Sequence, residues 1–152
     1  MRYSKYIDKR ALFGWQLHHV FYLDGNAEKI SWVIQTGDSK VNQSRNHVSI
    51  YKDKVTDLQS KYVALHIGLF WGIGVFIIKN EDTVNIKCDD EIMFNQVTSD
   101  SKIKDQLIQN RMQFIKQFII QRRLKVKFEL ISIDKNLAKK NIQNKKNKIK
   151  KD

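Results

Sequence analysis

The sequence predicts an α/β fold: a mixed five-stranded sheet, its first three strands antiparallel, flanked by helices and followed by a basic C-terminal helix or tail. Three early runs rich in aromatic and β-branched residues are separated by short polar turns, which is typical of an antiparallel meander. The hydrophobic spacing then changes to that of helices, and the later strands alternate with helices. This order favours a sheet that becomes parallel after the first helix.

The first three strands are predicted at residues 15–25, 29–37 and 46–54. The first run ends at Asp-Gly, a turn dipeptide, and the third shows visible alternation of apolar and polar residues. His18 and His19 point to opposite faces of the first strand, so we expect one of them to be buried and hydrogen-bonded.

A helix is predicted over residues 56–74, with Thr56 or Asp57 as the N-cap. Its apolar residues recur at helical spacing: Leu58, Tyr62, Leu65, Leu69 and Ile73. The remaining elements are a strand at 82–89, a short helix from 90, a long helix at 104–123, a strand at 124–133 and a helix-permissive basic end. Phe70, Trp71 and Phe76 suggest either a stacking platform for bases or packing in a core or interface, and packing is the favoured reading.

The net charge is +12, and the residues from Lys135 onward hold eight lysines and one acid, so this segment carries +7 of it. Such a charge favours polyanionic partners. No apolar run approaches the roughly 18 residues of a membrane span, and Cys88 is the only cysteine, which excludes disulfides and cysteine-based zinc sites within the chain. We expect a soluble intracellular protein, with mitochondrial, cytoplasmic and nuclear locations left open.

Four segments, taken in their order along the chain, resemble the ribonuclease H family, in its type I and reverse-transcriptase-like branch. "FYLDGNA" resembles the end of the family's first strand, and "SKYVALHIGLFWGIG" its first helix. "CDDEIMFNQV" resembles the family's Ser-Asp-Ser-x-x-x-x-Asn-Gln-Val segment, and "KFELISIDKNLAKKN" its last strand and following helix. The resemblance spans residues 15–143 and implies one domain there, preceded by an extension at 1–14 and followed by a basic tail at 144–152.

The resemblance implies four carboxylate positions, which correspond here to Asp24, Lys61, Asp89 and Lys140. The family's hydrolysis uses two divalent metals about 4 Å apart, and four carboxylates offset their charge. Lysines stand at two of these four positions. The formal charge of the site is therefore zero instead of the −4 of four carboxylates, and each ammonium group repels a dication. We therefore expect a catalytically degenerate member with no cofactor. Weak Mg²⁺ binding at Asp24 and Asp89 stays open, as does ligation by the nearby acids Asp57, Asp90, Glu91 and Asp134.

These observations predict a non-catalytic subunit that binds RNA or acts as a scaffold in a ribonucleoprotein, such as a mitochondrial ribosome, beside neighbouring proteins. One alternative is an active metal-dependent endoribonuclease on RNA–DNA hybrids. The other is a purely protein-binding subunit of a large assembly. The residues expected to contact nucleic acid are Arg122, Arg123, Lys125, Lys127, Lys139, Lys140, Lys145, Lys146, Lys148, Lys150 and Lys151.

Overall fold

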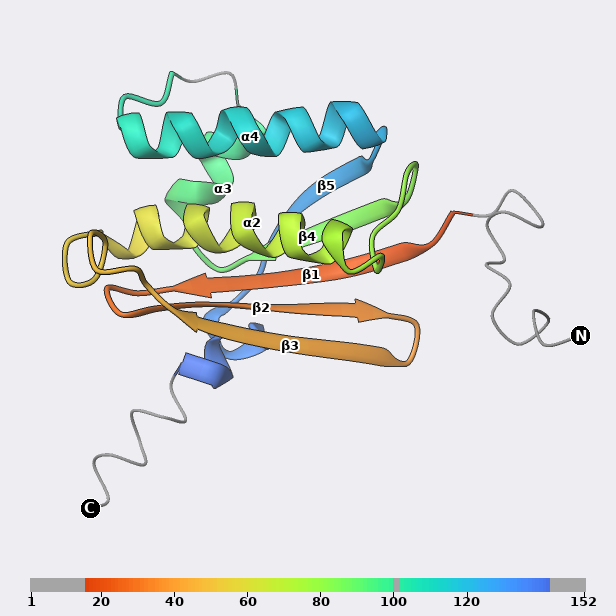
Figure 1. Ribbon diagram of the computed structural model, residues 1–152, viewed down its shortest axis with the longest axis horizontal. Coiled ribbons are helices and arrows are strands. Elements are labelled where there is room, and N and C mark those ends of the chain that lie inside the picture. Colours follow the sequence, from red (N-terminus) through yellow and green to blue (C-terminus); the bar gives the residue numbers. More distant parts are fainter. Residues whose placement is uncertain (1–15, 100–101, 143–152) are drawn as a thin grey trace, which may run out of the picture.

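The computed structural model describes residues 16–99 and 102–142, and five strands form a single sheet in it (Figure 1). Their order across the sheet is β3-β2-β1-β4-β5, and β1 is the central strand. β1 pairs antiparallel with β2 and parallel with β4, which confirms the predicted change of direction. The bounds are β1 His18–Gly25, β2 Lys29–Thr36, β3 Ser39–Asn46, β4 Thr83–Cys88 and β5 Lys125–Leu130.

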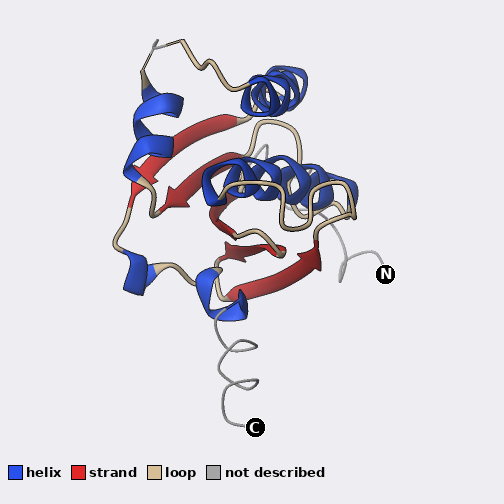
Figure 2. Cartoon of the chain, turned by 90° about the vertical axis from the view of Figure 1, so that its left-hand side faces the viewer, coloured by secondary structure: helices blue, strands red, loops and turns tan. Residues whose placement is uncertain are grey.

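Helices cover the sheet mainly from one side. α2 (Asp57–Gly74) lies along β1 and β2, and α4 (Gln106–Arg122) packs on α2. α3 (Glu91–Thr98) contacts β4 and β5. After β5 the chain passes through a 3-10 turn, η2 (Ile133–Lys135), and residues 139–142 are helical again. Figure 2 shows α2 and α4 stacked on one side of the curved sheet and these last turns on the other.

The core lies between the sheet and α2. Phe21 and Trp32 from the strands are fully buried, as are Tyr62 and Leu65 from the helix. Gly68 allows the close approach of these two layers, because a Cβ there would lie 2.5 Å from Phe21 Cζ and 2.9 Å from Trp32 Cγ. The helical spacing in the sequence therefore identified the buried face of α2 correctly.

The predicted N-cap of α2 is confirmed as Thr56. Its side chain accepts a hydrogen bond from the Gln59 backbone N–H, and the Gln59 side chain accepts one from the Thr56 N–H. This reciprocal pair satisfies two of the backbone N–H groups that a helix start leaves without partners.

The predicted third strand was wrong in position. β3 spans Ser39–Asn46, in full register with β2, whereas residues 47–55 form turns. β3 is an edge strand that is mostly exposed, so backbone pairing specifies it and no apolar alternation marks it. Val48 and Ile50, which produced the alternation at 46–54, are 61% and 70% exposed.

The two adjacent histidines behave as the strand pattern predicts. His18 is exposed, whereas His19 is buried and contacts Asp82 Oδ2 at 2.7 Å and Thr36 Oγ1 at 2.6 Å. The Asp82 carboxylate also accepts the backbone N–H groups of Leu17 and Lys79. The hydrogen bonds of Asp82 therefore connect the start of β1 to the loop before β4.

The predicted extension at 1–14 lies outside the described residues, and so does the tail at 144–152 with Lys145, Lys146, Lys148, Lys150 and Lys151. None of the helices in the part of the chain that the structure describes has the length and apolarity to cross a bilayer.

Candidate functional site

Asp24 and Asp89 lie side by side at the carboxyl ends of two parallel strands. Tyr22 of β1 pairs with Lys87 of β4, so two residues further along, Asp24 and Asp89 stand level with each other. Both are withdrawn from water, with 4% and 2% of their side chains exposed. Two buried carboxylates in contact range repel each other unless positive charge is supplied.

Lys61 supplies the first positive charge from the amino-terminal half of α2. Its Nζ lies 3.6 Å from Asp89 Oδ1 and 3.2 Å from Asp90 Oδ2, and it is 12% exposed. The helix pattern that fixes Tyr62, Ala64 and Leu65 in the core also points Lys61 at the strand ends. The structure thus brings together three of the four positions that the resemblance implied.

Lys139 supplies the second positive charge, in the place expected of Lys140. Lys139 Nζ lies 3.1 Å from Asp24 Oδ2 and 3.6 Å from Asp89 Oδ2. Lys140 is exposed, and no contact joins it to either aspartate. The count from Asn136 pointed to Lys140, but the alanine of the motif stands only two residues after Asn136. The residue directly after Ala138 is therefore the one that reaches the site.

Asn136 and Ala138 hold this last segment against the sheet. Asn136 Nδ2 donates to the Leu23 carbonyl at 2.9 Å and to Asp89 Oδ2 at 3.1 Å. The Ser31 hydroxyl donates to the Ala138 carbonyl at 2.6 Å. Both residues are buried, so the position of Lys139 is set by backbone and amide contacts and not by its own flexible side chain.

The electrostatics of the site reflect burial opposed by these contacts. Burial raises the pKa of Asp24, and the nearby Lys139 opposes this rise without cancelling it. Burial alone would lower the pKa of Lys61, but the charges of Asp89 and Asp90 outweigh it and hold that pKa above its ordinary 10.5. Burial also raises the pKa of the Cys88 thiol to about 11, which leaves this thiol uncharged and unreactive at neutral pH.

A pair of divalent metals does not fit this donor set. Three of the four oxygens of Asp24 and Asp89 lie within 3.6 Å of a lysine Nζ or of the Asn136 amide. Of these four oxygens only Asp24 Oδ1 lacks a side-chain partner among the described residues, and one free oxygen is a poor site for Mg²⁺. No group of three or more His, Cys, Asp or Glu side chains suited to a metal occurs within residues 16–99 and 102–142.

The acids considered as substitute ligands do not complete the cluster. Asp90 is the N-cap of α3, where it accepts the Met93 backbone N–H at 3.0 Å, and its other oxygen faces Lys61. Asp57, Glu91 and Asp134 are exposed. The site is therefore a carboxylate and ammonium cluster, with Asp24, Asp89 and Asp90 facing Lys61 and Lys139.

Five of the six expected nucleic-acid contacts on the described chain fall into two separated groups. Arg122, Arg123 and Lys125 lie where α4 meets β5, level with the start of β4, whereas Lys139 and Lys140 lie at the strands' other end. Arg123 is also paired with Glu81 at 3.2 Å. Along β5, Lys127 alternates with Val126 and Phe128, which pack on the core, so it faces the side of the sheet that α2 leaves uncovered.

No protein-family model matches the sequence, and no curated protein is similar enough to count as a match. Solved structures are similar. Ribonuclease H1 from the archaeon Halobacterium salinarum is 14% identical with a TM-score of 0.59, over 86% of this chain and 99% of that one. The N-terminal RNase H domain of a Mycobacterium tuberculosis protein, solved as a fusion with maltose-binding protein, is 14% identical with a TM-score of 0.62, over 88% and 99%.

LC11-RNase H1, isolated from compost by a metagenomic approach, is 19% identical with a TM-score of 0.54, over 84% of this chain and 97% of that one. Identities this low carry information on the fold and not on activity. The strand order, the antiparallel first three strands and the flanking helices agree with these structures across most of the chain. The protein therefore has the ribonuclease H fold.

Proposed function

We propose that this protein is a non-catalytic domain of the ribonuclease H fold that binds RNA as a component of a ribonucleoprotein. The observation that carries the first half of this proposal is the pair of lysines on the carboxylates: Lys61 and Lys139 each place Nζ within 3.6 Å of Asp89. These ammonium groups occupy the space and satisfy the charge that metals would otherwise take.

The magnitude of the repulsion supports this reading. Two unit charges 4 Å apart interact by about 4 kcal/mol at an effective dielectric constant of 20, and a dication doubles that figure. A Mg²⁺ ion between Asp24 and Asp89 would have to displace both lysines or bear this repulsion from each. The displaced ammonium groups would also lose their carboxylate partners.

The charge of the chain supports the second half of the proposal. The net charge of +12 includes eight lysines from Lys135 onward, and phosphate contacts by Lys and Arg release counterions from a polyanion. Lys127 and Lys140 are exposed on the described chain. One protein of this fold, LC11-RNase H1, has been solved in complex with an RNA/DNA hybrid, at 16% identity and a TM-score of 0.50.

The absence of catalysis is tested with labelled RNA–DNA hybrid at increasing Mg²⁺ and Mn²⁺. We expect no cleavage by the wild-type protein, and no heat of Mn²⁺ binding by titration calorimetry. The double variant Lys61→Glu/Lys139→Asp returns four carboxylates to the cluster, and we expect it to bind Mn²⁺. Wild-type cleavage that requires metal and disappears in Asp24→Asn would instead establish the enzyme alternative.

RNA binding is tested by fluorescence anisotropy with structured RNA, RNA–DNA hybrid and duplex DNA over a series of salt concentrations. We expect affinity that falls linearly with the logarithm of salt, and a smaller slope for a variant that lacks residues 143–152. The truncation keeps Asn136, Ala138 and Ile142, which are buried. Binding to none of the three probes at low salt would favour the purely protein-binding alternative.

Membership of a ribonucleoprotein is tested separately. The tagged protein is expected to sediment with RNA-containing particles in a density gradient, and to leave that fraction after ribonuclease treatment. A mitochondrial ribosome is one particle that this experiment would identify by its RNA. Sedimentation in the free fraction would contradict this part of the proposal.

A further inference from the structure

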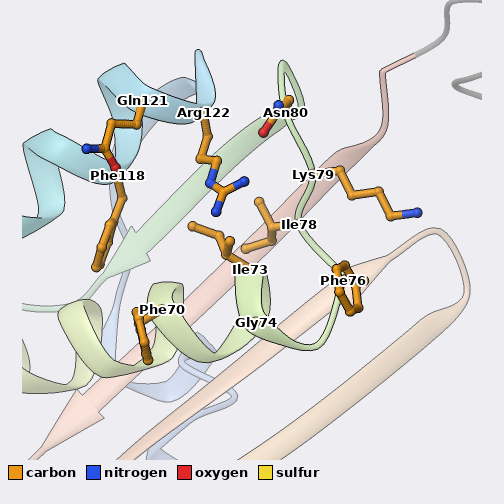
Figure 3. A pocket seen from close by; sticks show the side chains of 10 residues that line it. All are labelled: Phe70, Ile73, Gly74, Phe76, Ile78, Lys79, Asn80, Phe118, Gln121 and Arg122. Atoms are coloured by element: carbon orange, nitrogen blue, oxygen red, sulfur yellow. The ribbon is translucent and has the colours of Figure 1, made fainter.

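A cleft of about 730 Å³ opens at the end of the molecule away from the carboxylate cluster (Figure 3). It lies between the carboxyl ends of α2 and α4 and the loop that leads from α2 to β4. Lys61, at the cluster, and Gly74, at the cleft, are separated by 13 residues of helix, or about 20 Å. The cleft is therefore distinct from the site described above.

The walls of the cleft are apolar and aromatic. Phe70 and Phe118 approach each other from α2 and α4, with ring centroids 5.8 Å apart, and Ile73 and Ile78 form the floor with them. Phe70 is 61% exposed and Phe76, at the rim, is 74% exposed. Exposed apolar side chains that gather around a cleft are typical of a surface that binds a protein partner.

Phe76 occupies a backbone position that suits glycine. Its φ of 66° lies in the left-handed region, directly after the C-cap of α2, and bulky residues adopt this conformation only under strain. The backbone turn is closed by hydrogen bonds from Val75 to Trp71 and from Phe76 to Ile73, which do not depend on the side chain. The phenyl ring thus costs stability through the backbone conformation that it occupies and through its exposure to water, and a ring that is 74% exposed contributes little to the core.

The polar side chains that line the cleft carry positive charges or amide groups. Arg122 and Lys79 stand at its edge with Asn80 and Gln121, and no acidic residue lines it in the described chain. Figure 3 shows the Arg122 side chain directed over the cleft between Phe118 and Ile78. A partner that fills this surface needs apolar side chains for the walls and carboxylates for the rim.

We propose that this cleft, lined by Phe70, Ile73, Phe76, Ile78, Phe118 and Arg122, is the docking site for an acidic, apolar segment of a partner protein. Aliphatic side chains in the walls favour a peptide over nucleic acid, because bases stack on aromatic faces but gain little from isoleucine. The docking site does not depend on the function proposed for the cluster of Asp24, Asp89, Lys61 and Lys139.

The test is selection of a displayed library of random peptides on the full-length protein. We expect enriched peptides to combine Leu or aromatic residues with Asp or Glu. By anisotropy they should bind Phe76→Gly and Arg122→Glu about tenfold or more weakly than wild type, the loss typical of an interface hot spot. Phe76→Gly should also unfold at a higher temperature than wild type, which separates lost binding from lost folding.

Ile120→Ser provides the matched control, since Ile120 is 75% exposed near the end of α4 but does not line the cleft. Peptides should bind this variant as they bind wild type, and structured RNA should bind Phe76→Gly as it binds wild type. The proposal is overturned if no acidic apolar peptides are enriched, or if they bind Phe76→Gly unchanged. Competition by single-stranded RNA, or a wild-type dimer that Phe76→Gly abolishes, would assign the cleft to another occupant and also overturn it.

Discussion

At the scale of single residues, the cluster of Asp24, Asp89 and Lys139 shows how buried charges constrain one another. Each carboxylate is less than 5% exposed, so neither obtains its stabilisation from water. Removing an ammonium leaves a buried charge without a partner, which costs more than the ion pair contributes when intact. Protonation of Asp24, whose pKa is raised by burial, removes one of the buried negative charges and so reduces this cost.

Lys139→Ala is expected to lower the free energy of unfolding by about 2 kcal/mol at pH 7, because Asp24 and Asp89 lose their shared counterion. Lys140→Ala is the matched control, and its effect should stay within about 0.5 kcal/mol because Lys140 is exposed. Urea unfolding monitored by tryptophan fluorescence measures both. Equal effects of the two substitutions would show that the contacts of Lys139 contribute nothing.

The residues of this cluster differ in how far the sequence predicts them. Lys61 was predicted through the resemblance of "SKYVALHIGLFWGIG" to the family's first helix, and the helical spacing of Tyr62 and Leu65 fixes its place in α2. The lysine of the last segment is not predictable, because residues 136–138 belong to no regular helix or strand, so no periodicity fixes the count between Asn136 and the site. The buried Ala138, held through its carbonyl by Ser31, sets that register.

At the scale of elements, the position of α2 on the sheet depends on a missing side chain, at Gly68, as well as on its buried apolar side chains. Gly68 lies against Phe21 and Trp32, whereas a Cβ added at Gly74 in the same helix would have no atom within 4 Å. Both glycines weaken an isolated helix to a similar degree. Only the first is required for the helix to lie close to the sheet.

Gly68→Ala is expected to destabilise the protein by about 2 kcal/mol, since the new methyl forces Phe21 or Trp32 to move. Gly74→Ala should instead stabilise it by about 0.5 kcal/mol through helix propensity. Thermal unfolding by circular dichroism compares the two variants. A stabilising Gly68→Ala would mean that α2 and the sheet are not packed as closely as described.

The interface of α2 with α4 contains a histidine that stays neutral. His66 stacks on Phe114 with ring centroids 5.1 Å apart, and its Nδ1 accepts a hydrogen bond from Arg111 at 2.8 Å. Burial, aided by the charge of Arg111, lowers the pKa of His66 to about 4. Neutral His66 therefore makes its full contribution to stability at pH values above 6.5, the ordinary pKa of histidine.

As pH falls from 6.5 towards 4, the unfolded chain gains a proton at residue 66 that the folded chain does not, so stability should decrease over this range. His66→Gln should show a shallower decrease. His18→Gln, which removes an exposed histidine, is the matched control. Urea unfolding at several pH values measures the slopes, and identical slopes for wild type and His66→Gln would contradict the expectation.

Most elements were predictable because apolar periodicity reflects burial, and α2, α4 and the central strands are buried on at least one side. β3 was not, because an edge strand is specified by backbone pairing with β2, which leaves no pattern in side chains such as Asn42, Ser44 and Arg45.

At the scale of the whole molecule, the segment after β5 closes the fold on the side that α2 leaves open. Asn136 and Ala138 are buried against β1 and β2, and Ile142 is buried as well, although these are among the last described residues. The two ends of the sheet thus differ in character: one carries paired charges beneath this segment, and the other carries the aromatic cleft.

Deletion of residues 131–152 is expected to destabilise the protein strongly, by about 3 kcal/mol or more, because it uncovers Ser31 and Leu23 and leaves Asp24 without Lys139. Deletion of 143–152 should leave the unfolding temperature within a few degrees of wild type. Circular dichroism melts of the two truncations provide the comparison. Similar melting temperatures would show that the closing segment is dispensable.

The contact between Lys139 and Asp24 joins residues 115 positions apart in the chain, and the Asn136 contact with Leu23 joins residues 113 apart. Ribosomes make proteins from the amino end, so all five strands are synthesised before the residue that neutralises Asp24. Until then Asp24 and Asp89, at the carboxyl ends of the neighbouring strands β1 and β4, lack their shared counterion, so we expect a chain that ends before residue 139 to be less stable than the full chain.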